Sequence, residues 1–280
     1  MRRTTPPPPS TPLPPDIRVM NGVAALLCLG LVVASVWMGL QWLLRQPAFA
    51  IRAITVEGDV ARNSSASLRA NALPRLAGSF VSMNLQNVRQ AFEAVPWVRQ
   101  ASVQRIWPRR LLVRLEEHRP AAYWEAKPEG ADAQSDAVLE RRLVNSFGEV
   151  FEANLGDVED EELPVLAGPE GSAATMLAMW RQLQATSRQQ LGEGVSRLDL
   201  SGRGSWRATL DKGAQLELGR GEPAEVQARY AQFAASITQV ASRYQSTLVS
   251  ADLRHEQGYA VKLAGVTTVS TAPKGVTKKN

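Results

Sequence analysis

One uncharged stretch, Val19–Leu44, constrains this 280-residue chain more than any other part of its sequence. A helix rises about 1.5 Å per residue, so roughly 20 apolar residues cross the hydrocarbon core of a bilayer. Only a helix lets a single segment satisfy its own backbone hydrogen bonds there. Trp37 and Trp42 lie near the C-terminal end of the stretch, where amphipathic rings favour the headgroup layer. The sequence therefore predicts one transmembrane helix over residues 19–44, because no second long apolar run follows.

Two other interpretations of this stretch remain open. Ala48-Phe49-Ala50 has the small-x-small pattern of a signal peptidase site, so the stretch is also a candidate for a cleaved export signal. The apolar region of a signal peptide runs only about 7 to 15 residues, which favours a permanent anchor here. Gly30 and Ala34, four residues apart, would let a second helix approach closely.

Charge is distributed unevenly along the chain. Residues 49–118 contain 10 basic and 5 acidic residues, whereas residues 119–265 contain 15 basic and 21 acidic residues. The basic first part is suited to anionic lipid headgroups beside the membrane span or to an acidic partner protein. Its basic residues are spread over several elements without a stacking platform, so we expect no contact with nucleic acid.

The charges next to the span do not decide its orientation. Arg2, Arg3 and Arg18 precede it, and Arg45, Arg52 and Arg62 follow within reach of the positive-inside rule. Residues 1–18 contain the run PPPPSTPLPP, which predicts a solvated tail in polyproline conformations. Long folded domains cross membranes largely regardless of their charge, so a cytoplasmic tail is compatible with this count.

Residues 48–118 predict a small domain with the order β-α-α-β-β. The expected strands are Phe49–Gly58, Val98–Trp107 and Leu111–Glu117, and the expected helices are Ser64–Leu76 and the segment after the N-cap Asn84. In the last strand, apolar residues alternate with polar ones, which indicates one face to bury. Pro74 and Pro96 are expected to end the two helices.

Residues 119–265 predict a larger β domain with flanking helices. Strands are expected at Pro120–Ala126, Val138–Asn145, Glu149–Ala153, Val195–Leu200, Trp206–Leu210, Ala214–Leu218, Leu248–Arg254 and Tyr259–Ala264. Helices are expected over Ser172–Gln190 and from Pro223 to Val240, and loops over Lys127–Ala137 and in a disordered tail at 266–280. The last two strands form a terminal hairpin, whose outer edge offers unpaired N–H and C=O groups unless it is covered. The expected fold class is α+β: one transmembrane helix, a small domain, and a larger mixed or antiparallel sheet with helices.

The sequence shows no common catalytic motif and few candidate nucleophiles or bases. Its only Cys, Cys28, lies inside the span, and its two histidines are His118 and His255. No GxxxxGK[ST] loop, GxSxG elbow or HExxH helix occurs, and the acidic run Asp157–Glu162 lacks the ligand spacing of a calcium loop. We therefore expect no catalytic residue, metal, cofactor or small-molecule substrate, which disfavours the alternative of a cell-wall hydrolase or synthase.

Short motifs in a fixed order make the chain resemble known protein families in both domains. The first domain resembles a polypeptide-transport-associated (POTRA) domain through Ile54, Val56 and Gly58, Asn84-Leu85, Pro96-Trp97-Val98, Ala101, Val103, Pro108, Leu111, Val113 and Glu117-His118-Arg119-Pro120-Ala121. The second domain carries Leu218-Gly219-Arg220-Gly221 and Ala251-Asp252-Leu253-Arg254. Together with the Pro-rich tail and the single span, these motifs resemble the FtsQ/DivIB family of bacterial cell division proteins over nearly all of residues 19–264.

The resemblance implies a scaffold of the inner membrane with a cytoplasmic N-terminus, a periplasmic body and no catalytic activity. Members of this family link early and late division proteins and hold FtsB and FtsL, and an FtsW/FtsI-type synthase complex is a further expected partner. In the family, FtsB adds a strand to the last hairpin of the second domain, which here is Leu248–Ala264.

The resemblance also implies contact residues. The expected partner-binding residues are Arg254, His255, Gly258, Tyr259, Val261, Leu263 and Arg220, and a second face on the first domain comprises Gln100, Val103 and Arg105. The family often has Tyr at position 255 and can have Trp at position 263. We expect Arg254 to pair with a partner carboxylate and Tyr259, Val261 and Leu263 to form an apolar face. A POTRA-type component of envelope export or chaperoning is the alternative, although such systems normally continue into a long membrane β-barrel.

Overall fold

The structure is a computed structural model that describes residues 15–44, 51–58, 60–76, 79–128, 140–255 and 258–266. The Pro-rich segment, most of the loop expected after Lys127 and the C-terminal tail after Val266 lie outside these residues. The chain divides into two compact units, residues 1–117 and 118–280, which are described separately below.

The N-terminal apolar stretch forms one continuous helix, α1 (Pro15–Leu44). Within it, Val19–Trp42 has a mean hydropathy of 2.4, and none of its most apolar 18 residues is buried inside the protein. Pro15 opens the helix, where its missing N–H would have no partner in any case. The helix therefore has the length, composition and exposure of a membrane span, as the sequence predicted.

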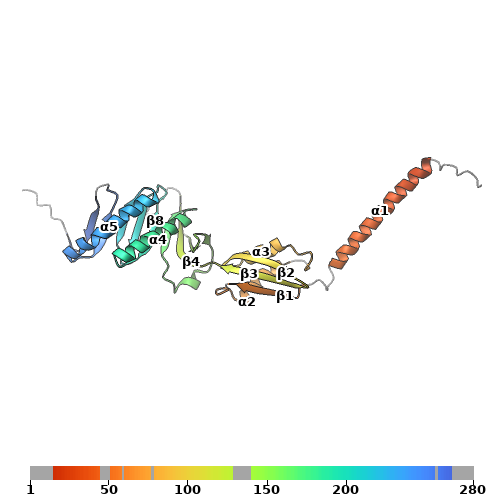
Figure 1. Ribbon diagram of the computed structural model, residues 1–280, viewed down its shortest axis with the longest axis horizontal. Helices are drawn as coiled ribbons and strands as arrows, with labels where there is room; N and C mark the ends of the chain where they lie inside the picture. Colours follow the sequence, from red (N-terminus) through yellow and green to blue (C-terminus); the bar gives the residue numbers. More distant parts are fainter. Residues whose placement is uncertain are drawn as a thin grey trace, which may run out of the picture. The chain divides into compact units, whose positions relative to one another are not determined.

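The first unit contains a three-stranded sheet in the order β1 (Ala53–Gly58), β3 (Arg110–Glu117), β2 (Val98–Ile106). β1 runs parallel to β3, and β2 runs antiparallel to it. Helices α2 (Ser65–Ala72) and α3 (Leu85–Glu93) and a short 3₁₀ helix, η2 (Leu73–Arg75), complete the unit. This order confirms the predicted β-α-α-β-β domain, with both of its outer strands exposed at sheet edges (Figure 1).

Local signals explain the ends of these helices. The Ser64 hydroxyl accepts a hydrogen bond from Ser67 N at 3.0 Å, and Asn84 Oδ1 accepts one from Gln86 N at 2.9 Å. α2 gives way to the 3₁₀ turn that contains Pro74, as expected from the missing N–H of proline. The core of the unit joins the helices to one face of the sheet through Leu68, Val88, Phe92, Ala101, Leu111, Val113 and Leu115.

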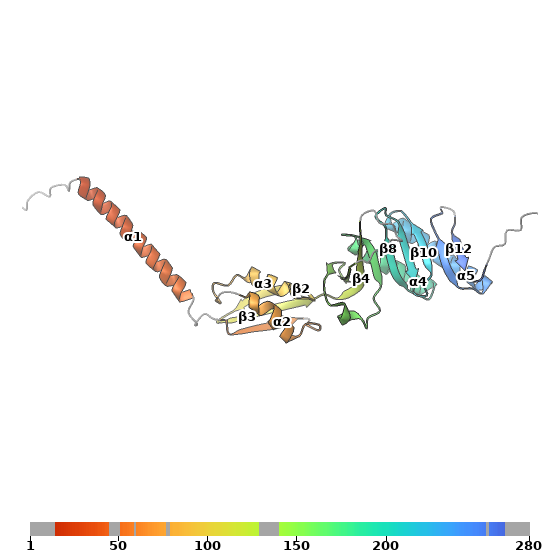
Figure 2. The same ribbon diagram turned by 180° about the vertical axis from the view of Figure 1, so that it is seen from behind.

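The second unit is built on a nine-stranded mixed sheet in the order β12-β11-β10-β9-β8-β7-β4-β5-β6. Its strands are β4 (Pro120–Lys127), β5 (Arg141–Asn145), β6 (Val150–Phe151), β7 (Val165–Pro169), β8 (Val195–Leu200), β9 (Trp206–Leu210), β10 (Gln215–Gly219), β11 (Leu248–Asp252) and β12 (Ala260–Leu263). Helices α4 (Ala173–Gln190) and α5 (Pro223–Tyr244) lie side by side on one face of the sheet. Figure 2 shows the sheet from the other face. A short 3₁₀ helix, η3 (Leu155–Val158), precedes β7. β7 lies between β8 and β4 within this sheet and was not predicted from the sequence.

A single row of paired residues runs across the helix-covered face of this sheet. Seven strands contribute to it in register, namely Trp124, Leu166, Leu198, Ala208, Leu216, Ala251 and Val261. The first six are buried and Val261 is half-buried at the end of the row. The hydrophobic core therefore continues as far as the edge strand β12.

Candidate partner-binding edge

The terminal hairpin lies at one end of the nine-stranded sheet. β12 pairs with β11 in antiparallel fashion, and no described strand pairs with its outer side. Ala264 N donates a hydrogen bond to Thr247 O at 2.9 Å, so the backbone of Ala264 points towards β11. Since backbone groups alternate along a strand, the N–H and C=O groups of Val261 and Leu263 point away from β11. These groups form the open edge.

The apolar side chains of this hairpin face helix α5. The Tyr259 ring packs edge-on against Phe233 with a centroid distance of 5.1 Å, and its hydroxyl lies 2.6 Å from Ser236 Oγ. Leu263 is buried, and Val261 packs against the same core. The apolar face expected from Tyr259, Val261 and Leu263 thus lies on the helix-covered side, where an added strand would extend the core.

Arg254 already has a carboxylate partner within its own hairpin. Its Nε and Nη2 donate to the two oxygens of Asp252 at 2.9 and 2.5 Å, and its backbone N donates to Asp252 Oδ1 at 3.0 Å. The hydrogen bond from the Arg254 side chain lowers the pKa of Asp252 to about 2, and the same contact raises the pKa of Arg254. The Arg254 side chain is nevertheless 60% exposed, and its Nη1 makes no hydrogen bond to the described residues. A partner carboxylate would therefore bind to a guanidinium that Asp252 holds in place.

Three arginines gather in a hollow beside this hairpin. Arg220, Arg229 and Arg254, with Ser205 and Gly219, line an open space of about 410 Å³. Arg229, on α5, donates to the carbonyl oxygens of Leu218 and Arg220. The Arg220 side chain is exposed and makes no hydrogen bond or ion pair with the part of the chain that the structure describes. The hollow is electropositive and suited to a carboxylate.

Gly219 permits the close packing of this hollow. Its φ of +81° belongs to the left-handed region that favours glycine, and a Cβ there would lie 3.0 Å from Arg254 Cγ. Arg220 and Arg254 were predicted from the sequence as binding residues, and the fold brings them together. Arg229 and Ser205 were not predicted, because they come from α5 and from the turn before β9 and nothing in their local sequence marks them.

The other predicted hairpin residues lie at its tip. His255 and Gly258 are exposed on either side of residues 256–257, which lie outside the described residues. A side chain at Gly258 would meet open space. Among the expected residues, the structure thus places Arg220 with Arg254 in the hollow, Val261 and Leu263 on β12 with Tyr259 just before it, and His255 with Gly258 at the tip.

The second expected face lies on β2, one of the two edge strands of the first unit. Gln100 is exposed, and Val103 packs against the core of the unit. Arg105 already binds within the unit: its guanidinium donates to Phe80 O at 2.8 Å and to Met83 O at 2.5 Å. The Glu93 side chain also accepts a hydrogen bond from Ala101 N at 3.1 Å. Part of this edge is therefore occupied by contacts within the unit.

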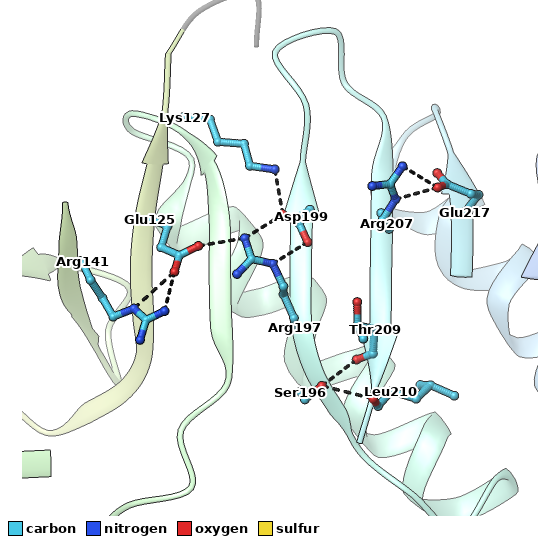
Figure 3. A network of polar contacts seen from close by, with 10 residues as sticks. All are labelled: Glu125, Lys127, Arg141, Ser196, Arg197, Asp199, Arg207, Thr209, Leu210 and Glu217. Carbon is cyan, nitrogen blue, oxygen red and sulfur yellow. Dashed lines mark hydrogen bonds and ion pairs between the residues drawn. The ribbon is translucent and has the colours of Figure 1, made fainter. Parts of the chain in front are cut away.

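The face of the large sheet opposite α4 and α5 carries a ladder of ion pairs across β5, β4 and β8 (Figure 3). Glu125 on β4 binds Arg141 and Arg197, each at 2.8 Å, and Asp199 binds Arg197 at 3.0 Å and Lys127 at 2.7 Å. These contacts cross β7, where the small residue Ala167 pairs with both Glu125 and Asp199 in the strand register. Burial alone would raise the pKa of Glu125, but the two arginines outweigh it and hold that pKa below its usual value. The ladder ties β5, β4 and β8 together and makes this part of the face polar.

Nothing in the described residues points to a metal centre, since they contain no group of three or more His, Cys, Asp or Glu side chains that could hold an ion.

Comparison with known proteins yields matches in both units. The family "POTRA domain, FtsQ-type" matches residues 49–118, and the family "Cell division protein FtsQ/DivIB, C-terminal" matches residues 135–254. Cell division protein FtsQ of Thiomonas arsenitoxydans is 37% identical over 255 residues, which cover 91% of this chain and 90% of the relative. The FtsQ proteins of Burkholderia pseudomallei and Bordetella pertussis are 35% and 34% identical, over 93% and 89% of this chain and 98% and 92% of their own lengths.

Proposed function

The chain belongs to the FtsQ/DivIB family of cell division proteins, and from this premise we propose that it is a non-enzymatic scaffold that takes up a partner strand at β12. Its relatives and the apolar helix α1 indicate a single-pass membrane protein. In this proposal the N-terminus is cytoplasmic and both folded units lie in the periplasm, where the scaffold links early and late division proteins.

The observation that carries the proposal is the end position of β12. The outward N–H and C=O groups of Val261 and the N–H of Leu263 can form up to three hydrogen bonds with an added strand, since the Leu263 carbonyl already accepts one from Val266 N at 3.4 Å. Each is worth about 0.5 to 1.5 kcal/mol net, so backbone pairing supplies a few kcal/mol before ordering costs. The core row that ends at half-buried Val261 adds affinity, because an apolar partner residue opposite Val261 would extend it beside α5.

The hollow beside the hairpin supports a particular kind of partner. In this proposal an acidic residue flanking the added strand binds Nη1 of Arg254 and the exposed Arg220. The strand we propose is therefore extended, apolar on one face and acidic at one end. Division proteins of the FtsB and FtsL type are the proposed partners, with an FtsW/FtsI-type synthase complex recruited through them.

Proline substitution tests the edge directly, because proline lacks the N–H that strand addition needs. We expect Val261→Pro to abolish co-purification of an FtsB-type partner with the full-length protein. Val150→Pro is the matched control. It changes a half-buried valine on β6, at the opposite edge of the same sheet, whose N–H also points outward because its neighbour Glu149 pairs inward with Asn145.

Both variants should keep the thermal stability of the parent chain within a few degrees, since neither loses a ladder hydrogen bond. Partner binding that survives Val261→Pro in a folded protein would contradict strand addition at β12. A charge reversal, Arg254→Glu, should weaken binding separately, and unchanged co-purification would remove Arg254 from the interface.

A further inference from the structure

The tip of the β2–β3 hairpin in the first unit exposes large apolar side chains. Trp107 is 83% exposed and Ile106 is 37% exposed. Trp107 was predicted to end the strand Val98–Trp107, but β2 ends at Ile106 and Trp107 lies in the turn. A tryptophan this exposed gains no free energy from burying its large ring within the protein. Such a side chain indicates a contact with another apolar surface.

A second loop brings another apolar residue to the same end of the unit. Arg105, next to Ile106, donates to the carbonyl oxygens of Phe80 and Met83 and thereby holds the loop between them against the end of β2. Val81, inside this loop, is 50% exposed. Exposed apolar side chains from two separate segments therefore lie at the same end of the unit.

This end of the unit is also where the chain arrives from the membrane span. Ala53, at the start of β1, pairs with Arg110, and Arg52 N donates to Arg109 O at 3.0 Å. Only residues 45–52 separate the end of α1 from β1. The nine steps from Leu44 to Ala53 span at most about 32 Å when extended, which limits how far the start of β1 and the hairpin tip beside it can lie from the end of the span.

We propose that the hairpin tip, Ile106–Arg110 together with Val81, rests on the surface of an anionic lipid bilayer and fixes the orientation of the first unit relative to it. Trp107 and its apolar neighbours would enter the headgroup layer, where amphipathic rings are favoured. The exposed Arg52 and Arg110 flank them and supply attraction to anionic headgroups. This contact is independent of strand addition at β12.

The membrane is favoured over a protein partner by the combination of features at this one end. The aromatic tip, the flanking arginines and the covalent link to the span coincide there. The far end of the same sheet lacks this combination, because Gln100 and Glu116, near the start of β2 and the end of β3, are polar.

Two glutamines on β2 provide a matched pair of reporters. Gln104 and Gln100 are both exposed and lie about 13 Å apart along the strand, with Gln104 nearer the tip. In full-length protein carrying Cys28→Ser, each is changed singly to Cys and labelled with an environment-sensitive fluorophore. The proteins are then placed in nanodiscs of phosphatidylcholine and phosphatidylglycerol in equal parts, with or without bromine on the acyl chains.

We expect brominated lipid to quench the label at 104 roughly twofold or more and the label at 100 little, because quenching requires approach to the acyl chains. Trp107→Ala should remove the quenching at 104, and Trp107→Phe should keep most of it. Equal quenching of the two labels, or quenching untouched by Trp107→Ala, would overturn the proposal. Full quenching in pure phosphatidylcholine would overturn the assignment of an anionic lipid.

A photo-reactive amino acid in place of Trp107 tests in cells whether the hairpin tip contacts lipid or protein. Lipid adducts support the proposal, whereas a protein adduct in their place would show that the tip is a protein-docking site.

Discussion

Among single residues, Gly219 directly shapes the three-arginine hollow that we propose as part of the partner site. Its left-handed backbone costs about 1 kcal/mol in any residue with a Cβ, and Gly219→Ala would also push the methyl group against Arg254. Gly204 is the matched control, because its φ is +77° and a Cβ there would meet open space. We expect both alanine variants to lose about 1 kcal/mol in urea unfolding. Only Gly219→Ala should also weaken partner binding, and equal binding by the two variants would separate Gly219 from the hollow.

Asp252 gives the hairpin a defined pH dependence. Its pKa is about 2 in the folded protein, against about 3.9 in an unfolded chain. A lowered folded pKa means that its contribution to stability is complete above about pH 4 and is lost as the pH falls through about 2. Since Arg254 is 60% exposed, solvent screening limits this contribution to about 1 kcal/mol.

Replacing Asp252 with Asn should therefore lower the free energy of unfolding at neutral pH and bring the variant closer to the parent between about pH 4 and pH 2. Urea unfolding across this range measures the difference. A difference that stays constant with pH would show that the carboxylate charge contributes nothing.

Between elements, the ion-pair ladder predicts unequal losses of stability for substitutions of its two buried members, Asp199 and Lys127. Asp199 serves both Lys127 and Arg197, and the Lys127 and Asp199 side chains are only 3% and 6% exposed. Asp199→Asn leaves the buried Lys127 with a weaker, uncharged partner, although the half-buried Arg197 keeps Glu125, so we expect a loss of about 3 kcal/mol. Lys127→Met leaves Asp199 bound to Arg197 and should cost only about 1 kcal/mol. Equal losses in urea unfolding would mean that Arg197 does not compensate.

The elements differ in how far the sequence predicts them. The amphipathic helices and alternating strands are predictable, because buried residues such as Leu111 and Val113 on β3 repeat with the period of the element that carries them. β7 was missed, because VLAGP is short, lacks alternation and ends in Gly-Pro, yet it is covered by parallel neighbours on both sides. The Asp252–Arg254 pair is local in sequence, because an Asp side chain at the end of a strand commonly accepts a hydrogen bond from the backbone N–H two residues on. The ladder and the arginine hollow depend on strand order, which no local pattern gives.

At the scale of the whole molecule, the proposed roles of β12 and of the hairpin tip both depend on the side of the membrane that holds the folded units. The arginine count beside the span is a tie, so orientation must be measured. Cys28 is the only cysteine, and a Cys28→Ser chain offers a background free of thiols.

In this background we expect a cysteine in place of Gln100 to react with a membrane-impermeant maleimide in intact spheroplasts, because the proposed orientation exposes the first unit to the periplasm. A cysteine in place of Ser10 should react only after lysis and should remain on the full-length chain. Labelling of Ser10→Cys before lysis would invert the orientation and contradict a periplasmic scaffold. Loss of that label from the mature protein would instead show cleavage near Ala50, which would leave the hairpin tip without the tether that keeps it at the bilayer.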